Sequence, residues 1–150
     1  MTDARSRARE APEAVREIIR RAGHELRNAL NGVAVNVEVV RSRSARDGSA
    51  KELTAFADRA SAQVGEASAL TDGLIALVGS VLSAQAAGTL KSTGGHGSGA
   101  AVEFSIHGDA APVVVSDIER LASRIAVGVE QHGPRVILRI LPEGKSHSKA

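Results

Sequence analysis

The chain has 150 residues, of which 43% are hydrophobic and 24% are charged, and its formal net charge is +2. This length allows one hydrophobic core, or a helical unit joined to a small module. Because the sequence contains no cysteine and only two aromatic residues, Phe56 and Phe104, it excludes disulfides and thiolate metal sites and disfavours nucleic-acid binding by base stacking.

The N-terminal residues and the most apolar stretch both bear on membrane association. Residues 1–11 are charged, lack apolar periodicity and contain no hydrophobic signal segment. The most hydrophobic stretch, residues 70–87, is interrupted by Asp72 and by several Gly and Ser residues. We therefore predict a frayed, charged lead-in over residues 1–11 and a cytoplasmic protein that binds neither a membrane nor nucleic acid.

A long amphipathic helix is predicted from about Pro12 to Arg43, where apolar residues recur at helical spacing. At 1.5 Å per residue this helix is roughly 45 Å long. His24 lies on the side opposite to the large apolar residues. The polar residues that share its side form a net basic stripe, which consists of Glu17, Arg20, Arg21, Arg27, Asn28 and Asn31.

The residue types around His24 suit a phosphoryl-accepting histidine. An imidazole ring is largely neutral and nucleophilic at pH 7, and the carboxylate of Glu25, at the flank of the same face, can orient one ring N–H and act as a base. Asn28, one turn further on, can position a water molecule or a phosphoryl oxygen. An anion arriving there would meet the binding residues Arg20, Arg21, Arg27 and Asn31.

A second helix is predicted after a short connection over residues 44–49. Gly48 can take a left-handed conformation, and Ser49 and Glu52 have the spacing of a capping box. Apolar residues then alternate at steps of four and three as far as Leu82. The two helices are expected to form an antiparallel hairpin over residues 12–87.

The hairpin has more apolar surface than its two helices can cover. Two hairpins related by a twofold axis form a four-helix bundle. The fold expected is therefore mainly α, a hairpin that dimerises into a four-helix bundle, with a small α+β module at the C-terminal end. The competing interpretation is a structural coiled coil whose exposed histidine is incidental.

The C-terminal part differs in composition from the hairpin. Residues 88–101 are rich in Gly and Ser and predict a flexible linker, in which His96 is a solvated loop residue. Residues 102–142 are expected to form the α+β module, and residues 143–150 a polar tail.

Within this module the pattern predicts three strands and one helix. The strands are expected over residues 101–106, 113–115 and 136–141. Ser116 is expected to cap a helix over residues 117–131, with Asp117 in its first turn. The histidines of the module and tail, His107, His132 and His147, have no companion ligands at metal spacing, so we expect no metal site of the chain's own.

The segment His24-Glu25-Leu26-Arg27-Asn28, followed by Ala29 and Leu30, resembles the H-box of sensor histidine kinases, in their dimerisation and histidine-phosphotransfer domain. The resemblance implies that His24 is phosphorylated, that Glu25 is the general base and that Asn28 supports dephosphorylation of a partner receiver domain. Ala29 stands where the family usually has Pro, so the helix should run straighter after the histidine.

The module resembles the kinase catalytic domain only in part. Asp117 to Leu121 resembles the start of the first helix of the ATP site, but Val127 and Gln131 stand where that family's helix carries Asn residues for magnesium and ATP. The chain also ends before the family's glycine-rich nucleotide boxes. The resemblance therefore implies a truncated catalytic domain that does not bind ATP.

These features predict a histidine phosphotransferase of a two-component phosphorelay rather than an autonomous kinase. His24 would exchange phosphoryl groups with the aspartates of response-regulator receiver domains, without ATP and with Mg²⁺ supplied by the receiver. Two alternatives stay open: a dimeric adaptor that binds a response regulator without catalysis, and a receiver phosphatase that uses Asn28 and a water molecule.

Overall fold

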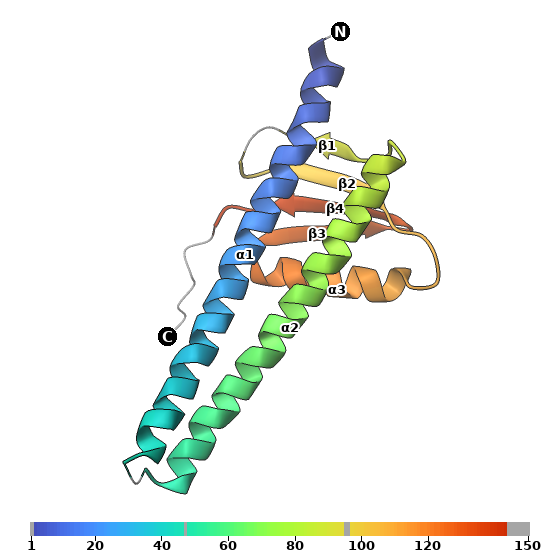
Figure 1. The fold of residues 1–150 in the computed structure, drawn as a ribbon. Helices are drawn as coiled ribbons and strands as arrows, with labels where there is room; N and C mark the ends of the chain where they lie inside the picture. The colour runs from blue at the N-terminus through green and yellow to red at the C-terminus, as the bar shows by residue number, and fades with distance from the viewer. Residues whose placement is uncertain (1, 47, 95–96, 144–150) are drawn as a thin grey trace.

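The computed structural model describes residues 2–46, 48–94 and 97–143. Two long helices, α1 (Thr2–Ser44) and α2 (Ala50–Ala86), form the predicted antiparallel hairpin (Figure 1). The module that follows consists of β1 (Lys91–Thr93), β2 (Ala101–Ser105), α3 (Ala111–Arg124), β3 (Val127–His132) and β4 (Arg135–Ile140). The mainly α fold with a small α+β module is thus confirmed.

The first helix begins well before its predicted start. Its backbone is helical from Thr2, so Pro12 lies inside α1 rather than in its first turn. Ala, Arg and Glu dominate the preceding residues, and these are strong helix formers. Because the residues before Pro12 favour a helix on their own, the prediction of a frayed lead-in is wrong for the backbone of residues 2–11.

The connection between the helices has half of the predicted capping box. Ser49 Oγ accepts a hydrogen bond from the backbone N–H of Glu52 at 3.3 Å. The Glu52 carboxylate instead forms an ion pair with Arg43 at 3.0 Å. Gly48 does not have the expected positive φ, and its N–H donates to the carbonyl of Arg43 at 2.9 Å.

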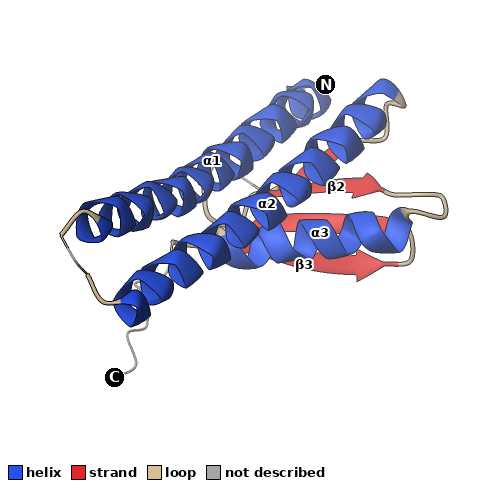
Figure 2. Ribbon diagram, turned by 60° about the horizontal axis from the view of Figure 1, so that its bottom comes forward, coloured by secondary structure: helices blue, strands red, loops and turns tan. Residues whose placement is uncertain are grey.

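The four strands form an antiparallel sheet in the order β1-β2-β4-β3. One face is apolar and is covered by α3 and by the hairpin (Figure 2). The buried residues of this face are Val102, Phe104, Val127, Val136, Leu138 and Ile140. The opposite face carries the ion pairs Arg135–Glu103 at 3.8 Å and Arg139–Glu130 at 3.6 Å. This polarity explains why only one face of the sheet packs against helices.

The prediction of a flexible linker over residues 88–101 is wrong for Lys91–Thr93, which form a strand. Lys91–Thr93 form the edge strand β1, which pairs with β2 and lies against α1. Gly88 has a φ of 68° and ends α2, with the backbone N–H of Thr89 donating to the carbonyl of Ala84 at 2.9 Å. A polar Lys-Ser-Thr segment has weak strand propensity, so β1 depends on the strand beside it. His96 lies outside the described residues.

The predicted strand at residues 113–115 is wrong, and the helix predicted over 117–131 is confirmed only for residues 117–124. Residues 111–124 form α3, with Pro112 in its first turn, and Ser116 and Asp117 lie inside it. The apolar residues of this segment recur at steps of three and four, and that spacing outweighs the β-branched run at 113–115. The buried ones are Val115, Ile118, Leu121, Ala122 and Ile125.

Val127 and Gln131, compared above with the Asn positions of the kinase ATP-site helix, do not lie on a helix. Val127 and Gln131 belong to β3, which turns into β4 through Gly133 and Pro134. Gly133 has a φ of 60°, which suits the first position of a two-residue hairpin loop. These two positions therefore do not correspond to the Asn positions of the kinase helix.

The hairpin and the module share one core. Ile18 of α1, Leu77 of α2, Leu121 of α3 and Phe104 of β2 are each 1% exposed and belong to a single cluster. The closest approach is at Gly73, where an added Cβ would lie 2.6 Å from the carbonyl oxygen of Asp117 and 2.6 Å from Leu121 Cβ. The loop end of the hairpin extends beyond the module (Figure 1).

Within the described residues, α2 is the one helix that is long and apolar enough to cross a membrane by length and composition. Only 33% of its most apolar window is buried in the chain. Core helices of soluble proteins meet the same criterion, so the composition alone does not assign α2 to a bilayer.

Candidate functional site

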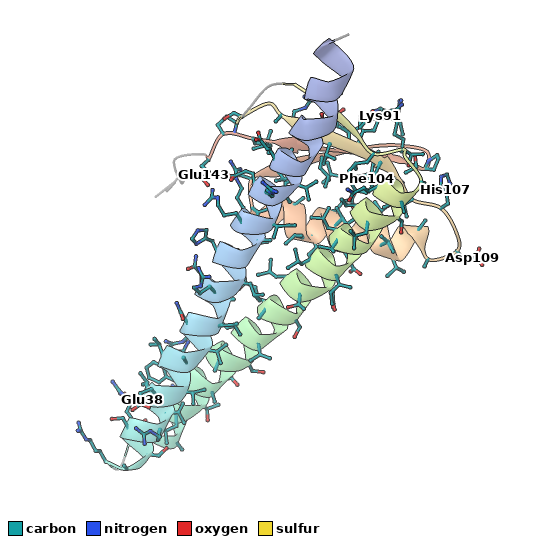
Figure 3. All side chains as sticks on the ribbon, turned by 45° about the horizontal axis from the view of Figure 1, so that its top comes forward. Glu38, Lys91, Phe104, His107, Asp109 and Glu143 are labelled. Carbon is teal, nitrogen blue, oxygen red and sulfur yellow. The ribbon has the colours of Figure 1, made fainter. Side chains whose placement is uncertain are left out.

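His24 is exposed on α1 and lies at a cleft of about 460 Å³ between this helix and the module. The side chain makes no hydrogen bond or ion pair with the part of the chain that the structure describes. The residues that line the cleft are Arg20, Arg21, His24, Glu25, Asn28, Arg124, Ile125, Ala126 and Glu143. Figure 3 labels Glu143, which lies beside α1. The cleft thus joins the predicted histidine to residues from the far end of the sequence.

Arg20 is held at the cleft by two carboxylates. Its Nε and Nη2 donate to the two oxygens of Glu17, both at 2.8 Å, and Nη2 lies 3.5 Å from Glu143 Oε1. Hydrogen bonds from Arg20 and then Arg21 lower the pKa of Glu17 to about 2. Glu17 in turn raises the pKa of Arg20, so this guanidinium is a permanent positive charge near His24.

Arg21, which is predicted to bind an anion, also has structural contacts in this fold. Its side chain is only 10% exposed, and its Nε donates to Glu17 at 2.8 Å. Its Nη1 donates to the carbonyl oxygens of Ile125, Ala126 and Leu141, at 3.3, 3.0 and 2.9 Å. Because Nε and Nη1 are both bonded within the chain, Arg21 fastens the module to α1 and is a structural residue of the cleft wall.

Glu25 points toward the module, where it meets Arg124 at the end of α3. The distance from Arg124 Nη2 to Glu25 Oε1 is 3.2 Å, and the same nitrogen also contacts Glu66 of α2. Glu25 therefore has a cationic partner that the sequence analysis missed. No local motif could have indicated it, because 99 residues separate the two side chains.

The remaining predicted residues divide into two groups. Asn28 is exposed and lines the cleft with His24. Arg27 and Asn31 are exposed on α1 but do not line the cleft. Ala29, where the histidine kinases usually have Pro, is buried, and α1 is a continuous helix through it. The structure thus brings His24, Glu25, Asn28, Arg20 and Arg21 together and leaves Arg27 and Asn31 outside.

A larger cleft of about 560 Å³ lies between α3 and the β3–β4 turn, and His107, Ser116, Glu119 and Gln131 are among its lining residues. Figure 3 places His107 and Asp109 on the β2–α3 loop, on the side of the molecule away from Glu143. Across the described ranges, no three His, Cys, Asp or Glu side chains gather as a metal site would require. Among the described residues, the lining of this cleft contains one carboxylate, Glu119, and no arginine or lysine, unlike the cleft beside His24.

Comparison with protein-family models, curated proteins and solved structures found no match to this chain.

Proposed function

We propose that this protein is a histidine phosphotransferase that exchanges phosphoryl groups between His24 and the aspartates of receiver domains. The observation that carries the proposal is the exposed imidazole of His24, unbonded to the described residues, at a cleft that also contains Arg20, Asn28 and Arg124. A nucleophile, a polar amide and cations at one open surface are the groups that in-line phosphoryl transfer requires.

The chemical step needs no nucleotide. A ring nitrogen of His24 attacks phosphorus of a receiver aspartyl phosphate, so that a P–N bond forms while the bond from phosphorus to the aspartate oxygen breaks. The aspartate leaves with the electron pair as a carboxylate, and the ring keeps its N–H on the second nitrogen. The receiver supplies Mg²⁺, which neutralises charge on the transferring group. The reverse sequence passes the phosphoryl group to a second receiver.

We further propose that the working form is a homodimer with a four-helix bundle. Both helices of the hairpin expose apolar side chains in a row, each at least 37% exposed: Ile19, Leu30 and Val37 on α1, and Val64, Ile75 and Leu82 on α2. Within each row the spacing follows steps of seven or eleven residues, as in helices that pack along a seam. The hairpin of a second copy of this chain carries the complementary surface for a twofold bundle.

A second candidate is a receiver-binding adaptor that performs no transfer. The pairing of Glu25 with Arg124, rather than with His24, favours it, because the expected base is engaged elsewhere. A receiver phosphatase using Asn28 and water would likewise dispense with phosphorylation of His24.

One experiment separates these functions. A panel of phosphorylated receiver domains is incubated with the wild type, with His24→Ala and with His132→Ala, a control at an exposed histidine of the module. Transfer of acid-labile phosphate to the wild type and to His132→Ala, but not to His24→Ala, supports the phosphotransferase. Equal binding of a receiver to all three proteins without transfer supports the adaptor, and loss of receiver phosphate that needs Asn28 but not His24 supports the phosphatase.

A further inference from the structure

Arg124 occupies an unusual position for a surface arginine. It is the last residue of α3, its side chain is 49% exposed, and it lines the cleft that contains His24. One nitrogen, Nη2, contacts carboxylates on both helices of the hairpin, Glu25 on α1 and Glu66 on α2. Within the described residues, Nε and Nη1 make no hydrogen bond. The guanidinium therefore keeps unused donors at the open side of the cleft.

The charges around Arg124 point to a role for this side chain other than packing. Glu25 and Glu66 both contact the same nitrogen, so their negative charges lie close together around Arg124, which lines the cleft with His24. A phosphoryl group arriving at His24 would be repelled by both charges if no cation stood between them. A half-exposed ion pair contributes little to stability, so holding the fold together is a weak reason for this arrangement.

We infer that Arg124 binds the phosphoryl group carried by His24, exchanging one or both carboxylate partners for phosphoryl oxygens, an inference that rests on the proposed phosphotransfer function. A guanidinium binds phosphate through two parallel N–H donors, and a phosphoryl group carries more charge than a carboxylate. The exchange frees Glu25, which can then accept the N–H of the second ring nitrogen. The module thereby takes part in transfer without binding a nucleotide.

The competing explanation is that Arg124 only ties α3 to the hairpin. Glu66 distinguishes the two explanations, because it forms an ion pair with Arg124 but does not line the cleft. If Arg124 is only a tie, Glu66→Gln and Arg124→Gln weaken the same contact and act in the same direction. If Arg124 binds the phosphoryl group, Glu66→Gln removes a competitor and a repelling charge, so Arg124→Gln slows loading and Glu66→Gln does not.

The test uses the full chain and phosphoramidate as a small donor, which transfers its phosphoryl group to an imidazole with release of ammonia. The loading rate and the lifetime of acid-labile phosphate are measured for the wild type, Arg124→Gln, Arg124→Lys and Glu66→Gln. Arg120→Gln is the matched control, because Arg120 lies one turn earlier on α3, pairs with Asp117 and is outside the cleft. Circular dichroism of each variant confirms folding.

We expect Arg124→Gln to load about tenfold more slowly, the scale of one charge-assisted hydrogen bond. Arg124→Lys should recover part of the rate, Glu66→Gln should load as fast as the wild type or faster, and Arg120→Gln should match the wild type. Equal loading of wild type and Arg124→Gln overturns the inference. Equal impairment of Arg124→Gln and Glu66→Gln overturns it as well. Both results leave the phosphotransfer proposal intact. If the wild type accepts phosphate from neither phosphoramidate nor any phosphorylated receiver, both proposals fall. Should Arg124→Gln not fold, Arg124→Lys and Glu66→Gln still decide the question.

Discussion

Arg21 Nη1 donates a hydrogen bond to the carbonyl oxygen of Ala126, 3.0 Å away, across 105 residues of sequence. Ala126 has a φ of 52°, a conformation that non-glycine residues seldom adopt, and its carbonyl also accepts the backbone N–H of Leu141 at 3.0 Å. These bonds hold the turn between α3 and β3 beside His24. The wall of the cleft therefore depends on a residue of the long helix.

Arg21→Ala should lower the free energy of unfolding by about 2 kcal/mol, because it leaves three carbonyl groups without this donor at a mostly buried site. Urea denaturation measures the change. Arg16→Ala is the control, since Arg16 is an exposed arginine of the same helix. Equal midpoints for the two variants would contradict the structural role of Arg21.

Gly73→Ala should destabilise the protein by about 2 kcal/mol, because the new Cβ meets the backbone of α3 at 2.6 Å and forces the helices apart. Gly65→Ala is the matched change on the same helix, where an added Cβ meets nothing within 4 Å. It should stabilise the helix by roughly 0.5–1 kcal/mol. Thermal unfolding measures whether each variant is more or less stable than the wild type. A stabilised Gly73→Ala would show that α2 and α3 do not pack this closely.

Acid should weaken the cluster around Glu17 in a defined pH range. Its pKa in the folded protein is lowered to about 2, so its stabilising contribution is fully present above its ordinary pKa of 4.5 and is lost as the pH falls through about 2. Because the cluster is partly open to solvent, we expect about 1 kcal/mol. The difference in unfolding free energy between wild type and Glu17→Gln should shrink as the pH falls from about 5 to about 2, because this range covers the two pKa values of Glu17. A difference that is constant over this range would exclude the ion pairs as its source.

If the protein is the proposed dimer, charges placed in the exposed apolar rows of α1 and α2, the dimer seam, should lower its mass in solution. The wild type should behave as a dimer of the 15.5 kDa chain in light scattering. Leu30→Glu with Ile75→Glu places charges on two exposed apolar positions and should raise the dimer dissociation constant at least about a hundredfold. Val35→Glu changes an equally exposed valine of α1 outside the seam and should leave the mass unchanged. A monomeric wild type would remove the bundle from the proposal.

The helical hairpin and the position of His24 could be predicted from the sequence, because both depend on local periodicity. Apolar residues at steps of three and four determine which side of α1 faces a partner, and His24 lies on the other side. Ser49 marks the start of α2 through a contact with a residue only three positions away. The strands β2 and β4 were predicted for the same reason, from short apolar alternation.

Tertiary structure alone decided the edge strand and the composition of the cleft. Lys91–Thr93 form a strand because β2 offers them a partner. Arg21 and Arg124 acquire their roles from groups about a hundred residues away, Ala126 and Glu25. Local spacing specifies which face of a helix is apolar, whereas the partner of a charged side chain is specified by how the helices and the sheet pack together.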